Sequence, residues 1–127
     1  MSPGQFAKTP FPKVSIIIPA YNHARYLNES IGSVFNQTYS NIELIVLDDG
    51  STDGTSEVLR QLEGKFFWES HQNMGQALTL NKGWRMAKGS ILSYLSADDV
   101  LYPEAVERCV KVLADNPQAV LCYPDFD

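Results

Sequence analysis

"VSIIIPAYNHARYLNESIGSVFNQTYSNIELIVLDDGSTDGT", residues 14 to 55, contains two apolar runs separated by a segment of helical period. The runs are VSIII from residue 14 and IELIVL from residue 42, and both are apolar at nearly consecutive positions. Such runs suit strands that are covered on both faces, which is typical of a parallel sheet. Between them, Leu27 and Ile31 recur at the spacing of one helix face. The stretch therefore predicts a β-α-β unit.

The same alternation continues along the rest of the chain. Three more β-rich runs follow, and the strand starts lie 24 to 28 residues apart: FFWES from 66, ILSYL from 91 and AVLCY from 119. Segments of helical period separate them at residues 58–62, 77–87 and 106–113. This pattern predicts a Rossmann-like three-layer α/β/α sandwich with a mostly parallel sheet and right-handed crossovers. FFWES is the weakest of these runs and is compatible with a short edge strand.

Length and composition indicate one domain, because 127 residues with 44% hydrophobic content can form a real core. Residues 1–13 carry three prolines and no periodicity, which predicts an extended or disordered lead-in. The domain is expected to occupy residues 14–127. Cys109 and Cys122 lack the close spacing of a zinc or redox motif, so reduced, buried thiols are expected.

Charge and hydropathy exclude several classes of partner. The formal net charge of -5 leaves no basic surface for a phosphate backbone, so nucleic acid is disfavoured. No apolar run approaches the roughly 20 residues of a transmembrane helix, and the N-terminus lacks the features of a signal peptide. We expect a soluble, cytoplasmic chain, which a full-length protein could hold at the inner membrane face.

Polar residues follow each predicted strand. Because open parallel sheets bind ligands at the carboxyl ends of their strands, these segments predict a pocket at one rim of the sheet. They contain an aromatic ring, several carboxylates and amides, which is more than four independent turns need. The segments are PAYN at 19–22, DDGSTDGT at 48–55, HQNMGQ at 71–76 and SADD at 96–99.

Two of these segments also have a purely structural interpretation. Pro19 could end a strand and Asn22 could cap a helix, with odds about equal to those of a role for Tyr21 as a flat face for a nucleobase. Gly50 suits a turn, and the residues after it suit a helix cap. Capping does not explain both Asp48 and Asp49, so a carboxylate that accepts hydrogen bonds from a base or a ribose is favoured there.

The remaining polar residues are weaker indicators. NMGQ suits a loop by itself. Lys82 and Arg85 are more often solvated than functional, and Trp84 is more often part of a core. Neither His23 nor His71 has a partner at metal-ligand spacing, so neither is assigned a role.

The adjacent acids Asp98 and Asp99 allow two interpretations. They could begin a turn and a helix near Pro103. Alternatively, with no His or Cys nearby, they offer hard oxygen ligands that suit Mg²⁺ or Mn²⁺, and such a cation often shares phosphate oxygens. A P-loop NTPase or a dinucleotide dehydrogenase is disfavoured, because the chain has neither a Walker A sequence nor G-x-G-x-x-G.

In combination, the segment from residue 14 to 55 and NMGQALTLNKGWRMAKGSILSYLSADD at residues 73–99 resemble the N-terminal half of a family 2 glycosyltransferase with the GT-A fold. The resemblance runs from Val14 to the end of the chain. It implies inverting transfer of a sugar from a nucleoside diphosphate, commonly UDP, to an acceptor hydroxyl of a carbohydrate or glycolipid. It also implies Mn²⁺ or Mg²⁺ as a cofactor and a role in polysaccharide or glycoconjugate biosynthesis.

Carried over by position, the resemblance implies that Tyr21 stacks on the base and that Asp49 hydrogen-bonds it. Asp98 would hold the ribose and Asp99 would bind the metal, with SADD standing where the family has its DXD-type motif. The nucleotide-binding residues implied in this way are Pro19, Ala20, Tyr21, Asn22, Asp49, Ser51, Asn73, Lys82, Ser96, Ala97 and Asp98.

The chain departs from the family pattern in two positions and in length. Many members have an acid at the position of Ser96 and an arginine at that of Leu80; Lys82 or Gln76 is a candidate to compensate. The family domain normally continues beyond the position of Asp127 with the acceptor site and a carboxylate base, so we expect a donor-binding half that is inactive alone and self-associates. A non-catalytic nucleotide-binding or regulatory module is the alternative, whereas the acids of a phosphoacceptor receiver domain are missing where that fold requires them.

Overall fold

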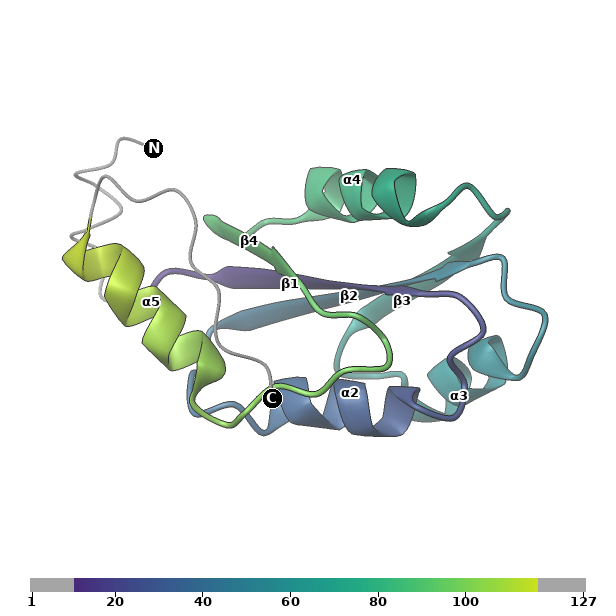
Figure 1. Ribbon diagram of the computed structural model, residues 1–127, viewed down its shortest axis with the longest axis horizontal. Helices are drawn as coiled ribbons and strands as arrows, with labels where there is room; N and C mark the ends of the chain where they lie inside the picture. The colour runs from purple at the N-terminus through teal and green to yellow at the C-terminus, as the bar shows by residue number, and fades with distance from the viewer. Residues whose placement is uncertain (1–10, 117–127) are drawn as a thin grey trace.

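The computed structural model describes residues 11–116. Most of the predicted lead-in and the fifth predicted strand, which starts at residue 119, lie outside these residues. Figure 1 shows strands alternating with helices, as the sequence predicts. The elements are β1 (Val14–Ala20), α2 (Leu27–Phe35), β2 (Ile42–Asp49), α3 (Thr55–Leu62), β3 (Phe67–His71), α4 (Gln76–Met86), β4 (Ile91–Tyr94) and α5 (Ala105–Asp115).

The strands form one parallel sheet in the order β3-β2-β1-β4. The weakest predicted run becomes β3, a five-residue strand that lies at one edge of this sheet. The chain first builds outward from β1 to β2 and β3, and then returns through α4 to place β4 on the other side of β1. The order of the strands therefore reverses between β1 and β4, which is where open sheets of this kind bind ligands.

Helices cover both faces of the sheet, which explains the near-continuous apolar runs in the sequence. Ile16 and Ile18 belong to a core cluster with residues of α2, α3 and α5, whereas Ile17 belongs to a second cluster with Leu80 and Trp84 of α4. Figure 1 shows α4 on one face of the sheet and the other three helices on the opposite face. Trp84 thus packs against the core and is partly buried, in line with the structural role that the sequence favoured.

Gly83 allows α4 to lie very close to β1. A Cβ atom at this position would come within 2.6 Å of Ile17 Cγ2, so a side chain has no room there. The loop that follows β3 leads directly into the N-terminus of α4. The close packing of α4 on the sheet therefore helps to fix the position of this loop.

Pro19 lies inside β1 and pairs in register with Leu47, so it does not end the strand. The reason lies in the direction of its backbone. Leu95 N donates to Ile17 O (2.9 Å), so the backbone N–H and C=O groups of Ile17 point toward β4. Alternate residues of a strand point the same way, so the backbone nitrogen of Pro19 also faces β4. Pairing with β4 stops at Ile17 and Tyr94, and the missing N–H of Pro19 therefore costs no ladder bond.

Two further sequence predictions concern the periphery of the domain. In residues 11–116 there is no helix with the length and apolarity that crossing a bilayer requires. Cys109 lies on α5 as predicted and is half-buried rather than buried, and Cys122 lies outside the described residues.

Candidate functional site

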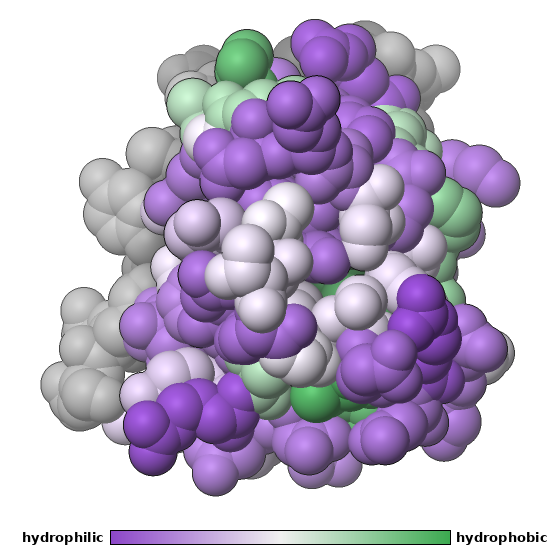
Figure 2. Space-filling view, turned by 90° about the vertical axis from the view of Figure 1, so that its right-hand side faces the viewer, coloured by the Kyte–Doolittle hydropathy of each residue, from purple (hydrophilic) through white to green (hydrophobic). Residues whose placement is uncertain are grey.

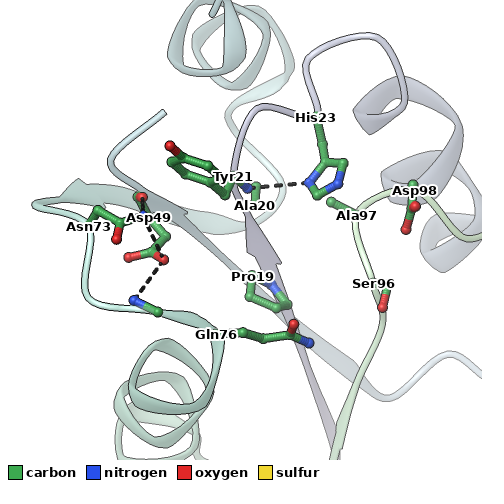
Figure 3. A pocket seen from close by; sticks show the side chains of 11 residues that line it. Pro19, Ala20, Tyr21, His23, Asp49, Asn73, Gln76, Ser96, Ala97 and Asp98 are labelled. Carbon is green, nitrogen blue, oxygen red and sulfur yellow. Dashed lines mark hydrogen bonds between the residues drawn. The ribbon is translucent and has the colours of Figure 1, made fainter. Parts of the chain in front are cut away.

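A cavity of about 440 Å³ opens at the carboxyl ends of the strands. Beyond Leu95 the chain turns away from β1. Ser96, Ala97 and Asp98 therefore lie on one side of the cavity and Asp49 and Asn73 on the other, with Pro19, Ala20 and Tyr21 between them (Figure 3). Figure 2 looks onto this end of the molecule, where hydrophilic residues surround small areas of hydrophobic surface. The lining residues are Pro19, Ala20, Tyr21, His23, Asp49, Asn73, Gly75, Gln76, Ser96, Ala97 and Asp98.

Asp49 is the most enclosed acid of the cavity, with only 4% of the residue exposed. Its Oδ1 atom accepts hydrogen bonds from Met74 N (2.8 Å) and His71 Nε2 (3.0 Å). Its Oδ2 atom accepts from Gly75 N (3.1 Å) and, at 3.4 Å, from Asn73 Nδ2. The carboxylate therefore holds the loop between β3 and α4 in place. The longest of its four hydrogen bonds, from Asn73 Nδ2 to Oδ2, is the weakest.

Asp48 differs from its neighbour, because it does not line the cavity. Its two oxygens accept from Ser51 N (3.1 Å) and from the Ser70 hydroxyl (2.8 Å), and the residue is buried. The two acids of the DDGS segment thus divide into one that fixes the turn after β2 and one that faces the cavity.

Asn22 joins the loops that follow β1 and β2. Its backbone lies in the left-handed region (φ 56°), and its N–H donates to Ser51 Oγ (2.9 Å). Its Oδ1 atom accepts from Thr52 N (2.8 Å) and Asp53 N (3.3 Å). Asn22 therefore accepts from backbone N–H groups just before α3 and does not cap its own helix α2. These bonds fix the loop that carries Tyr21.

Asp53 strengthens the same junction. Burial raises the pKa of its carboxyl, but hydrogen bonds from the Thr55 hydroxyl and from the backbone N–H groups of Ala24 and Thr55 outweigh burial, so the pKa is lowered from the ordinary value of 3.8. The ionised carboxylate is thus the form that holds the two loops together.

The loop after β4 presents the two adjacent acids differently. Asp98 is exposed and lines the cavity, whereas Asp99 is exposed but is not among the lining residues. Asp99 N donates to Ser96 O (3.0 Å), which closes a tight turn around the pair. The first helical residue after this loop is Ala105, two positions beyond Pro103.

The structure brings together eight of the twelve predicted site residues around the cavity. The four others are Asn22 and Ser51, which join two loops, Lys82, which contacts β3, and Asp99. Two lining side chains were not assigned from the sequence: Gln76 was considered only as a substitute for the family's arginine, and His23 was given no role. Leu80, at that arginine's position, is a buried residue of α4 and packs in the core against the sheet.

His71 is a further residue that the sequence did not indicate. Its Nδ1 atom lies 3.0 Å from Lys82 Nζ, and Lys82 also forms an ion pair with Glu69 (2.9 Å). Asp49, His71 and Lys82 therefore form a chain of contacts that leads from the cavity to a partly exposed lysine of α4.

The fold and the site define an open parallel α/β domain with a ligand cavity at the point where the strand order reverses, which is the arrangement of nucleotide-binding sheets. The model of the family "Glycosyl transferase family 2" matches residues 15–125, so the chain belongs to this family. It is 42% identical over 112 residues to an uncharacterised glycosyltransferase of Rickettsia prowazekii, covering 87% of this chain and 35% of that protein.

Solved glycosyltransferases share the fold. A mannosyltransferase from Pyrobaculum calidifontis, in complex with GDP-Man and Mn²⁺, aligns with a TM-score of 0.73 at 27% identity and covers 90% of this chain and 38% of its own. TarS of S. aureus (residues 1–349), in complex with UDP-GlcNAc, aligns with a TM-score of 0.72 at 26% identity over 81% of this chain and 31% of its own. The predicted GT-A fold is thereby confirmed.

Proposed function

We propose that this chain binds the donor of an inverting glycosyl transfer, in which a sugar passes from a nucleoside diphosphate to an acceptor hydroxyl. The observation that carries the proposal is the convergence of Tyr21, Asp49 and Asp98 on one cavity, from the loop after β1, the end of β2 and the loop after β4. A few well-placed polar groups are enough for such recognition. A stacking ring and a hydrogen-bond acceptor would contact the base, and a second acceptor would contact the ribose.

Tyr21 is the stacking residue of this proposal. It lines the cavity and is 46% exposed, so its ring is available to a planar base, and a stacked base typically contributes roughly 1–3 kcal/mol. Its loop is fixed by Asn22, which supports Tyr21 without contacting the ligand. Ser51 shares this supporting role, because its Oγ atom accepts a hydrogen bond from Asn22 N (2.9 Å).

Asp49 is the base acceptor. The base N–H would approach Oδ2 where the present donor, Asn73 Nδ2, is most distant at 3.4 Å. Asn73 would remain in place on binding, because Nδ2 also donates to the backbone oxygen of Asp49 at 3.0 Å. An imide such as that of uracil offers a single N–H for this direction, which favours UDP.

Asp98 is the ribose acceptor, since its exposed carboxylate lies across the cavity from Asp49 (Figure 3). Pro19, Ala20, Ser96 and Ala97 form walls around the sugar and base.

Asp99 is the proposed metal ligand. No cluster of three His, Cys, Asp or Glu side chains suited to a metal occurs within residues 11–116, so most of the coordination would come from the diphosphate and water. Carboxylate oxygens fit Mn²⁺ or Mg²⁺, and the related mannosyltransferase was solved with Mn²⁺. When bound, the cation would neutralise negative charge on the diphosphate leaving group.

The proposed role of this chain is donor binding. The chain spans 35% of the length of its Rickettsia relative, and no acid at the cavity is proposed as the base that activates an acceptor. An inverting transfer needs such a base within hydrogen-bond reach of the acceptor hydroxyl. We propose that residues 14–127 bind the donor without turnover, and that a larger protein contributes the acceptor site and the base.

Calorimetry with UDP, GDP, ADP and NAD, each with and without Mn²⁺ or Mg²⁺, tests the proposal. We expect UDP to bind best and to bind more tightly with metal. GDP belongs in the panel because the two related structures hold different nucleotide sugars. A folded chain that binds none of the four would contradict the donor site. A chain that binds nucleotide but shows no metal effect, alone or within a longer protein, would favour the non-catalytic module.

A further inference from the structure

The contacts of His71 determine which of its ring nitrogens carries a proton. A lysine ammonium can only donate hydrogen bonds, so the nitrogen that faces Lys82 Nζ at 3.0 Å, Nδ1, must be the acceptor. The proton of the neutral ring then lies on Nε2, which faces Asp49 Oδ1 at 3.0 Å. A carboxylate is the matching acceptor for this N–H.

Thr79 leads to the same assignment independently. Its hydroxyl donates to Gly75 O (2.8 Å), so its oxygen can only accept from His71 Nε2, which lies 3.3 Å away. Both neighbours of Nε2 are therefore acceptors, and the neighbour of Nδ1 is a donor. His71 is largely buried, with 12% of its side chain exposed, so water does not readily replace these partners.

Lys82 is itself oriented from outside the cavity. Its ammonium forms an ion pair with Glu69 at 2.9 Å, on the adjacent strand β3, and it is not among the residues that line the cavity. With 30% of its side chain exposed, it lies between solvent and the buried imidazole.

We infer that Lys82 and His71 are positioning residues for nucleobase recognition: Lys82, from the Nδ1 side, reinforces the Nε2–H tautomer of His71 that the acceptors at Nε2 favour, and this N–H orients the Asp49 carboxylate toward the base. The inference rests on the proposed function, because it assigns the purpose of the chain of contacts to the donor site. It gives Lys82 an indirect role, in contrast to a direct contact with the diphosphate. The Oδ1 atom of Asp49 accepts from Met74 N at 2.8 Å and His71 Nε2 at 3.0 Å. The second donor of Oδ2, Asn73 Nδ2, is more distant at 3.4 Å, so Oδ2 is the oxygen that a ligand N–H would approach.

A double-mutant cycle distinguishes the indirect role from a direct one. Lys82→Met removes the donor and keeps most of the aliphatic stem, and we expect it to weaken UDP binding by about 3- to 30-fold. His71→Gln places an amide N–H near the position of Nε2, and an amide has no tautomer that Lys82 could influence. Adding Lys82→Met to His71→Gln should therefore change UDP affinity by less than about twofold. Lys82→Arg restores a donor and should restore binding.

The matched control is Lys111→Met, which removes one exposed positive charge from α5 and should leave affinity unchanged. Thermal unfolding of every variant identifies any that fail to fold. A Lys82→Met effect of equal size in both backgrounds would overturn the inference and indicate direct contact with the donor.

Nitrogen-15 NMR of the histidine rings supplies a readout that needs no nucleotide. The chain has two histidines, so His23→Gln assigns the spectrum. We expect the Nε2–H tautomer of His71 in the unsubstituted chain, and in Lys82→Met a changed Nδ1 resonance with a smaller excess of this tautomer, because only the acceptors at Nε2 then favour it. An Nδ1–H tautomer, or a spectrum unchanged by Lys82→Met, would refute the role of Lys82. A folded chain with the expected tautomer but no affinity for any nucleotide would instead refute the proposed function and, with it, the assignment of this chain of contacts to base recognition.

Discussion

Asp49 and His71 are register partners at the ends of two neighbouring parallel strands, and Asp49 Oδ1 lies 3.0 Å from His71 Nε2. This pairing places a hydrogen-bond donor beside the acid that faces the cavity. The carboxylate thus has four donors around it within the protein, and substitutions at this position affect both the ligand site and the loop between β3 and α4.

Asp49→Asn is expected to weaken UDP binding by about 10- to 100-fold with or without metal, because it removes a charge-assisted hydrogen bond to the base. The new amide would also direct an NH₂ group at backbone donors of the loop. Calorimetry at fixed metal concentration measures the change, and Glu57→Gln, an exposed acid on α3, is the control. An Asp49→Asn chain that loses only its metal dependence would contradict the assigned role.

Asp99→Asn is expected to abolish the enhancement of UDP binding by Mn²⁺ while leaving metal-free affinity nearly unchanged, since a neutral amide is a poor ligand for a hard cation. A titration of Mn²⁺ into the UDP-bound chain, followed by calorimetry, measures this. Equal losses with and without Mn²⁺ would show that Asp99 contacts the nucleotide itself.

Tyr21→Ala is expected to weaken UDP binding by about 5- to 150-fold, the range that corresponds to one stacked base, whereas Tyr21→Phe keeps the flat ring and should stay close to the original affinity. Tyr26→Ala is the control, because Tyr26 is similarly exposed but is not among the residues that line the cavity. Loss of binding in Tyr21→Phe would indicate that the hydroxyl, rather than the ring, is recognised.

Gly83→Ala is expected to lower the free energy of unfolding by about 1–3 kcal/mol, because its Cβ would overlap Ile17 Cγ2 at 2.6 Å. Gly32→Ala on α2 is a matched substitution with the opposite expected sign: no atom lies within 4 Å of its Cβ, and helix propensity favours alanine by about 0.5–1 kcal/mol. Urea unfolding of both variants measures the two changes. A Gly83→Ala chain as stable as the original would mean that α4 moves freely on the sheet.

Asp53 should make stability depend on pH in the acid range. Because the folded-state pKa lies below the ordinary value of 3.8, its contribution is complete above that value and is lost as the pH falls through the folded-state pKa. Asp53→Asn should therefore reduce the difference in unfolding free energy between pH 6 and acid pH. Carboxyl NMR titration of Asp53 measures the pKa directly, and a value at or above the ordinary one would contradict the assigned hydrogen bonds.

The sequence predicted the strands and the site loops well for a physical reason. β1 is buried along its whole length, so an apolar run marks it clearly, and parallel strands place all their carboxyl ends on one rim. Tyr21, Asp49 and Asp98 could therefore be predicted to meet before any distance was known.

The contacts of His71 and Asn22 could not be predicted in the same way. His71 meets Asp49 through the register of β2 and β3, and a run of apolar residues does not define register. Asn22 reaches across to the next loop from a left-handed backbone conformation, whereas the sequence offered a helix cap as one of two equally weighted interpretations. Both contacts depend on where separate segments come to lie.

Ala20 and Ala97 lie at the cavity with 0% and 1% of their surfaces exposed, one after β1 has left its pairing with β4 and the other in the loop beyond β4. Alanine is the smallest residue that has a Cβ atom. The space between these two segments is therefore open because neither position has side-chain atoms beyond Cβ. A larger residue at either one would narrow the opening without removing any hydrogen-bonding group. The size of ligand that the cavity can hold thus depends in part on two methyl groups, and it can change independently of the acids that line the cavity.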